Sequence, residues 1–118
     1  MGQGLETRRR FPRREFGRQI GILSAGQYVV NQGIEIGEGG LSFSHTLGHN
    51  PGSLAVVSFR VPGGDFVSLR IEVRSCIAGK APGQFTVGAM FNKITFAERR
   101  MIRNYVSARY VSASDNSN

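Results

Sequence analysis

The sequence has a single cysteine, Cys76, among its 118 residues. One cysteine cannot form an intramolecular disulfide, and no cysteine cluster is present to hold zinc. The basic N-terminus is not followed by an apolar stretch of signal-peptide length, and no run approaches the length of a membrane span. We therefore expect a reducing, cytoplasmic setting, without export and without membrane insertion.

The sequence also lacks the residue patterns of common catalytic sites. No Ser-His-Asp or Cys-His arrangement stands out, and no paired carboxylates suggest hydrolysis. His45 and His49 are the two histidines of the chain, but no cysteine or nearby carboxylate completes a ligand set around them. These absences give no sign of a catalytic site and predict that the protein binds no metal.

Lysine is scarce, because only Lys80 and Lys93 contribute to the 15 basic residues. Arginine has a planar fork of donors that suits bidentate recognition and stacking. The net charge of +7 is also uneven, with one basic group near each end of the chain. This distribution favours a specific anionic partner over a diffuse polyanion.

Alternation of apolar and polar residues predicts a mainly β fold. Residues 67–74 alternate without a break, and residues 85–91 repeat the pattern after the Ala81-Pro82-Gly83 turn, so the two runs are expected to form an antiparallel hairpin. About six strands at this spacing predict a small antiparallel barrel or sandwich. The other expected strands are 19–23, 28–36, 41–44 and 54–61.

The pattern changes at Thr95, which is followed three residues later by Glu98 and so predicts a helix start with a capping box. One face of this helix is apolar and the other is basic, so the apolar face is expected to pack on the sheet. We expect a flexible segment over 1–7, a single domain over 8–111 and a disordered tail over 112–118. The apolar face comprises Met101, Ile102, Tyr105 and Val106, and the basic face comprises Arg99, Arg100, Arg103 and Asn104.

Five arginines lie in the run Arg8-Arg9-Arg10-Phe11-Pro12-Arg13-Arg14. Pro12 disfavours the helical region for Phe11, so a turn or an irregular loop is expected here. Several guanidinium groups in a loop can converge on one ligand and donate to phosphate oxygens or to the O6 and N7 edge of guanine. The run is therefore a candidate site for an anionic nucleotide.

A second candidate element is the run Glu35-Ile36-Gly37-Glu38-Gly39-Gly40-Leu41. If Ile34 and Ile36 face the core, Glu35 and Gly37 share the outer face of the strand. A carboxylate beside bare backbone can read a base, and the two adjacent glycines let a flat ligand approach closely. A plain hairpin turn is the alternative interpretation of this run alone.

Taken together, the two runs resemble the signatures of the PilZ domain, an RxxxR motif in an N-terminal loop and a [D/N]xSxxG motif at a strand end. Arg9 and Arg13 match the paired arginines of the first motif, and Glu35-Ile36-Gly37-Glu38-Gly39-Gly40 aligns with the second. The resemblance continues through 87–91 and the arginine-bearing helix, and covers roughly residues 6 to 110.

The resemblance implies a six-stranded antiparallel β-barrel with a C-terminal α-helix that binds cyclic di-GMP. It implies a receptor and not an enzyme, with a protein target such as motility, pilus or polysaccharide machinery. Arg9 and Arg13 would hold phosphate and guanine, and Glu35, Gly37 and Gly40 would contact the other guanine face. Further candidates in the same run are Arg8, Arg10 and Arg14.

Two positions depart from the family pattern. Glu35 stands where the family has Asp or Asn, and Gly37 stands where it has Ser. Losing the serine hydrogen bond costs about 0.5 to 1.5 kcal/mol, and moving the carboxylate outward by one methylene costs a similar amount, so the two together are expected to make binding roughly tenfold to a hundredfold weaker. The alternative function is a degenerate adaptor that binds proteins and little or no nucleotide. Nucleic-acid binding ranks last, because no aromatic residues alternate with basic ones on a strand.

Overall fold

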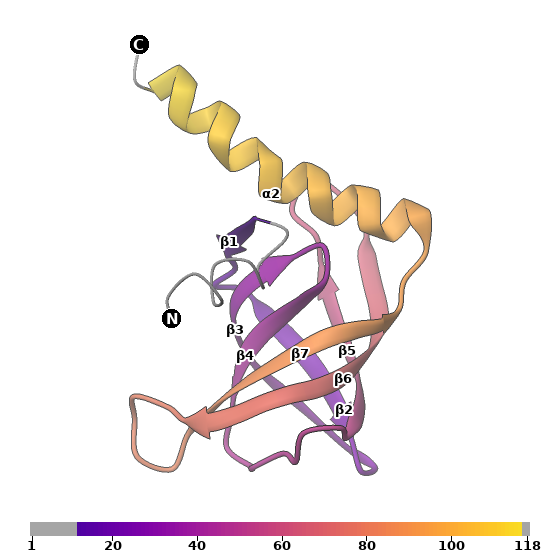
Figure 1. Cartoon of the computed structure of the whole chain (residues 1–118), viewed down its shortest axis with the longest axis vertical. Helices are drawn as coiled ribbons and strands as arrows, with labels where there is room; N and C mark the ends of the chain where they lie inside the picture. The colour runs from indigo at the N-terminus through magenta and orange to yellow at the C-terminus, as the bar shows by residue number, and fades with distance from the viewer. Residues whose placement is uncertain (1–11, 117–118) are drawn as a thin grey trace, which may run out of the picture.

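The computed structural model describes residues 12–116, with side chains up to residue 108 (Figure 1). Within this range, the strands come first and a helix follows them. The elements are β1 (Arg13–Glu15), β2 (Gln19–Ser24), β3 (Gln27–Gly37), β4 (Gly40–His45), β5 (Leu54–Arg60), β6 (Phe66–Ala78), β7 (Phe85–Lys93) and α2 (Phe96–Asn116).

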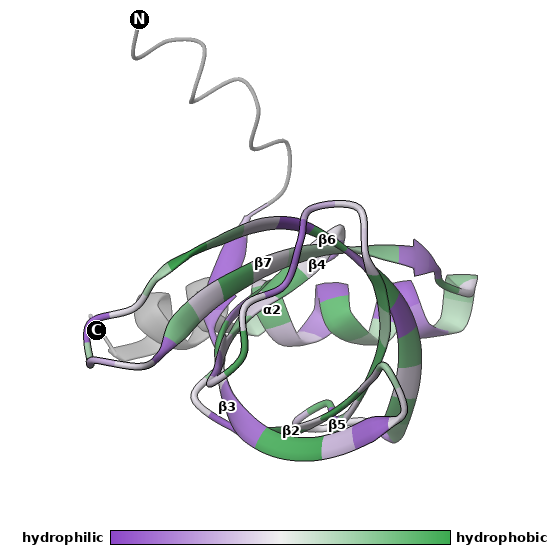
Figure 2. Cartoon of the chain, turned by 90° about the horizontal axis from the view of Figure 1, so that it is seen from below, coloured by the Kyte–Doolittle hydropathy of each residue, from purple (hydrophilic) through white to green (hydrophobic). Residues whose placement is uncertain are grey.

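The strands of the described part form one antiparallel sheet in the order β1-β3-β2-β5-β6-β7-β4, and β4 pairs back onto β3. This last pairing closes β2 to β7 into a six-stranded barrel, which is visible as a ring in Figure 2. The predicted barrel and its C-terminal helix are therefore confirmed. The predicted hairpin of β6 and β7 is confirmed too, with Ile77 opposite Thr86.

The core fills the barrel because each strand turns alternate side chains inward. In β6, Val67, Leu69, Ile71 and Val73 are buried, whereas the residues between them lie toward the outer face. Phe16, Phe43 and Phe59 are the largest of the fully buried side chains in this core. Burying one such side chain contributes about 1.5–3 kcal/mol, so the barrel interior is the main source of stability.

Helix α2 begins at the expected capping box. The Glu98 backbone N–H donates to Thr95 Oγ1 at 3.1 Å, and the Thr95 N–H donates to Glu98 Oε1 at 3.0 Å. Ile102 and Val106 are buried against the barrel, which confirms the predicted apolar face. In the part of the chain that the structure describes, no helix has the length and apolar character needed to cross a bilayer.

The described helix backbone ends at Asn116. The expected bounds of the flexible segment (1–7), the domain (8–111) and the disordered tail (112–118) stay predictions. Residues 112–116 include no glycine or proline that would end a helix. The structure differs from the sequence prediction in the N-terminal arginine run, for which a loop was expected. Residues 13–15 instead form strand β1, because β3 extends beyond β2 and its edge is free to pair.

Candidate functional site

Strand β1 brings the arginine run alongside the second candidate run. Arg13 lies opposite Gly37, Arg14 opposite Ile36 and Glu15 opposite Glu35. The same edge of β3 pairs with β2 further along, and the Phe16 N–H donates to the Ile34 carbonyl at 2.8 Å between the two pairings. The ladder therefore places the described parts of the two runs next to each other, at the end of β3 that extends beyond β2.

Arg13 and Glu35 form an ion pair across this ladder. Arg13 Nη1 is 3.8 Å from Glu35 Oε1, and the two side chains are 41% and 38% exposed. This distance exceeds that of a charged hydrogen bond, and exposed pairs contribute less than about 1 kcal/mol. The pair therefore leaves Arg13 available to another anion at little cost.

The two glycines of the second motif allow close backbone approach. A Cβ atom at Gly37 would lie 3.0 Å from the Pro12 carbonyl oxygen, so a serine there would require a small shift of the backbone at Pro12. A Cβ atom at Gly40 would collide with the Ala89 carbonyl and lie 2.9 Å from Met90 Cα. Gly40 is thus needed for the pairing of β4 with β7, whether or not it contacts a ligand.

Arg14 is directed toward α2. Its Nη1 donates to the Tyr105 carbonyl at 2.8 Å, and its guanidinium lies 4.1 Å from the centroid of the Tyr105 ring. Tyr105 in turn donates from its hydroxyl to the Glu15 carbonyl at 3.2 Å. These contacts tie β1 to the helix and occupy Arg14.

Glu38 lies between the motif glycines and was not among the predicted site residues. Its side chain is about 10% exposed and accepts a hydrogen bond from Arg103 Nη2 at 3.1 Å. This bond raises the pKa of Arg103 above its ordinary value. No sequence pattern links Glu38 to a residue as distant in the chain as Arg103. The only signal in the sequence is the position of a glutamate between the glycines of the turn.

Of the predicted site residues, the structure brings Arg13, Glu35 and Gly37 together and places Arg14 against the helix. Gly40 lies at the start of β4, packed on β7. The remaining predicted residues, Arg8, Arg9 and Arg10, lie outside the described residues. The role of all eight in ligand binding stays a prediction.

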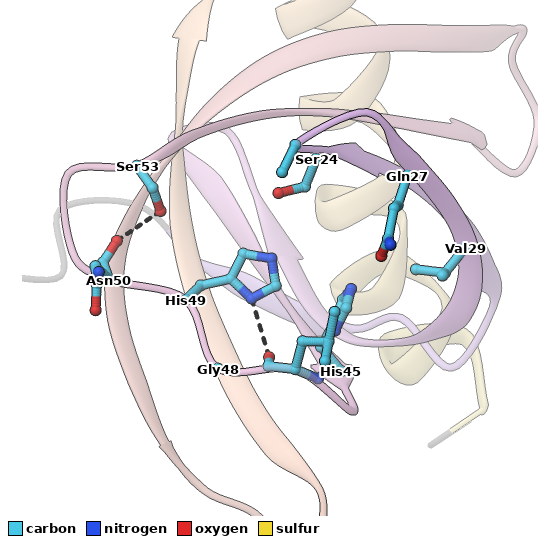
Figure 3. Close-up of a pocket in the computed structure, with 10 residues that line it drawn as sticks. Ser24, Gln27, Val29, His45, Gly48, His49, Asn50 and Ser53 are labelled. Carbon is cyan, nitrogen blue, oxygen red and sulfur yellow. Dashed lines mark hydrogen bonds between the residues drawn. The ribbon is translucent and has the colours of Figure 1, made fainter.

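A cavity of about 220 Å³ lies near the end of the barrel away from α2 (Figure 3). His45 and His49 line it with ring centroids 4.5 Å apart. The Leu47 N–H donates to His45 Nδ1 at 2.9 Å, and the Leu47 carbonyl lies 3.0 Å from His49 Nδ1. Among residues 12–116, no group of three or more His, Cys, Asp or Glu is placed to hold a metal ion.

Comparison with known proteins identifies the class that this fold and site define. The model of the PilZ domain family matches residues 7–108. This match includes both candidate motifs, the whole barrel and the first turns of α2. The chain belongs to the PilZ domain family.

Solved structures of low sequence identity share the fold. The Bacillus subtilis inhibitor of motility MotI/DgrA superposes with a TM-score of 0.79 at 14% identity, over 88% of this chain and 52% of that protein. YcgR from Escherichia coli in complex with c-di-GMP gives 0.72 at 11% identity, over 93% and 49%. The K. pneumonia MrkH–c-di-GMP complex gives 0.70 at 15% identity, over 92% and 55%.

The chain therefore spans about half the length of these three proteins. No curated protein matches it.

Proposed function

We propose that the chain is a cyclic di-GMP receptor that regulates a partner protein and catalyses no reaction. The observation that carries this proposal is the antiparallel pairing of Arg13 with Gly37, which puts the described end of the arginine run beside the Glu35–Leu41 run. Membership of the family supports it, as do two structural neighbours, YcgR and MrkH, that were solved with c-di-GMP.

Arg9 and Arg13 hold phosphate and guanine in this proposal, with Arg8 and Arg10 as further contacts. Arg13 exchanges its long, exposed pairing with Glu35 for the ligand. A planar guanidinium offers two parallel donors to phosphate or to the O6 and N7 edge of guanine. Glu35 and the bare backbone at Gly37 then meet the other guanine face.

Ligand binding regulates the partner protein through a change in the N-terminal arginine segment. Because several arginines converge on one ligand, binding orders that segment and changes the surface around β1. The partner is a cytoplasmic protein of motility, pilus or polysaccharide machinery. Binding of the nucleotide requires no metal.

Isothermal titration calorimetry with cyclic di-GMP tests this function. Arg13→Ala is expected to weaken binding about tenfold to a hundredfold, because a hydrogen bond to a charged group contributes about 1.5–3 kcal/mol. Arg70→Ala is the matched control, since Arg70 is an exposed arginine on β6, three strands from β3 around the barrel. Equal affinities of wild type and Arg13→Ala would contradict the assignment.

The second candidate function is a degenerate adaptor that binds a protein and little or no nucleotide. It is favoured by Gly37, where a serine side chain would crowd the Pro12 carbonyl, and by Glu35, which already pairs with Arg13. The same titration separates the two functions. Absence of heat at high micromolar cyclic di-GMP would favour the adaptor, and clear binding by the wild type would exclude it.

A further inference from the structure

One turn of α2 is fixed on the barrel core directly above the candidate site. Ile102 and Val106 are 0% and 2% exposed, and the ring of Tyr105 packs edge-on against Phe16 with centroids 5.9 Å apart. Figure 1 shows this part of α2 crossing the barrel end next to β1 and the turn between β3 and β4. This helical turn is therefore held in place by its packing on the barrel core, and residues that contact it are held in place with it.

Polar contacts run from this turn to both segments of the site. On one side, Arg14 in β1 stacks on Tyr105 and donates to its carbonyl, while Tyr105 donates to the Glu15 carbonyl. On the other side, Arg103 donates to Glu38, which lies one residue after Gly37. One helical turn thus holds the arginine strand and the glycine-rich turn at a set separation.

Glu38 depends on Arg103 as its partner. It is one of two polar residues, with His45, that are buried in the described part of the chain, and a buried carboxylate without a partner is costly. Arg103 is itself 52% exposed and is held by the helix. Removing the guanidinium leaves the Glu38 carboxylate without this partner, so the side chain must turn toward water, and that movement displaces the backbone of the glycine-rich turn.

We infer that Glu38, Arg103 and Arg14 are positioning residues through which α2 holds β1 and the turn after Gly37 at the separation that the nucleotide needs. This inference rests on the proposed function. It removes Arg14 from the expected ligand contacts and assigns it to the helix. The inference also couples nucleotide binding to the docking of α2 on β1 and the glycine-rich turn. If docking of α2 strengthens nucleotide binding by some factor, the bound nucleotide must strengthen the docking of α2 by the same factor.

Arg103→Gln tests the coupling, with Arg100→Gln as the control because Arg100 is exposed on the same helix. We expect Arg103→Gln to weaken cyclic di-GMP binding about tenfold, within the usual range of about 5- to 150-fold for coupled sites, and Arg100→Gln to change it less than about twofold. Arg103→Lys retains the charge and is expected to recover part of the affinity. Equal affinities of the two glutamine variants would overturn the inference.

A double variant tests whether Glu38 and Arg103 act through each other. The double variant Glu38→Gln with Arg103→Gln is expected to have an affinity for cyclic di-GMP no lower than that of the single variant with the lower affinity. The reason is that each single change already breaks the same contact. Losses that multiply in the double variant would mean that the two residues act independently. That result would overturn the positioning role.

Amide hydrogen exchange supplies readouts that a general loss of stability would not reproduce. Without ligand, Arg103→Gln is expected to speed exchange in 13–15 and 37–40 but not in β5 or β6. With ligand, wild type is expected to gain protection at 103–106, and Arg103→Gln is expected to lose this gain.

These exchange data also separate two kinds of failure. If the wild type binds no cyclic di-GMP, the proposed function fails and the nucleotide clause of the inference fails with it. The ligand-free exchange then still decides whether α2 holds the two segments. Unchanged exchange in 13–15 and 37–40 would overturn that part as well.

Discussion

At the scale of single residues, the candidate site depends on where side chains are absent as much as on where they are charged. Gly37 lets the Pro12 carbonyl approach β3, and Gly40 lets β4 pair with β7. The departure from serine at position 37 is therefore matched to the position of β1. Glu35 differs from the family pattern by one methylene, and its carboxylate comes within 3.8 Å of Arg13.

His45 provides a residue-scale prediction about pH. Burial, and secondly the nearby charge of His49, lower the pKa of His45 from its ordinary value of 6.5. Its Nδ1 accepts from the Leu47 N–H, a role that protonation would end. The residues that line the cavity around it include no Asp, Glu, Lys or Arg, and Phe43 packs edge-on against its ring.

Because the unfolded chain takes up this proton at a higher pH than the folded chain, acid favours unfolding. The contribution of His45 to the free energy of unfolding is expected to be fully present above pH 6.5. It is expected to fall as the pH drops below 6.5 toward the lowered pKa of folded His45. Urea unfolding between about pH 5 and 8 measures this effect, with His45→Asn as the control that keeps an acceptor but does not titrate. Parallel pH profiles for the two proteins would contradict the assignment.

At the scale of secondary-structure elements, β1 and α2 define the site more than the barrel strands do. The three-residue strand β1 exists because β3 offers an unpaired edge, and it carries Arg13 to Gly37. Helix α2 then contacts β1 through Tyr105 and the glycine-rich turn through Arg103. Sequence periodicity predicted the helix and its apolar face but could not predict these contacts, because they join residues distant in the chain.

The start of α2 gives a prediction at the element scale. Thr95→Ala removes the hydroxyl that accepts from the Glu98 N–H, and so breaks half of the capping box. Loss of such a cap is expected to lower the free energy of unfolding by about 0.5–2 kcal/mol, measured by urea unfolding. Ser107→Ala, at an exposed position in the middle of the helix, is the control. Equal stabilities of the two variants would show that the cap contributes nothing.

At the scale of the whole molecule, strict alternation in segments such as 67–74 was enough to predict the strands, and the family motifs were enough to predict the closed barrel. The sequence could not reveal that Arg14 serves the helix, or that buried Glu38 has Arg103 as its partner. Both contacts depend on how α2 crosses the barrel. The candidate site and the His45 cavity lie toward opposite ends of the barrel, so a ligand can be assigned to one or the other.

Backbone amide chemical-shift mapping during titration with cyclic di-GMP tests the central claim most directly. Binding where the two motifs meet predicts saturable shifts in 13–15, 35–40 and 103–105, and little change in 24–29 and 45–53 at the other end of the barrel. Shifts confined to that other end, or no shifts at high micromolar ligand, would contradict a cyclic di-GMP site at the junction of β1, β3 and α2.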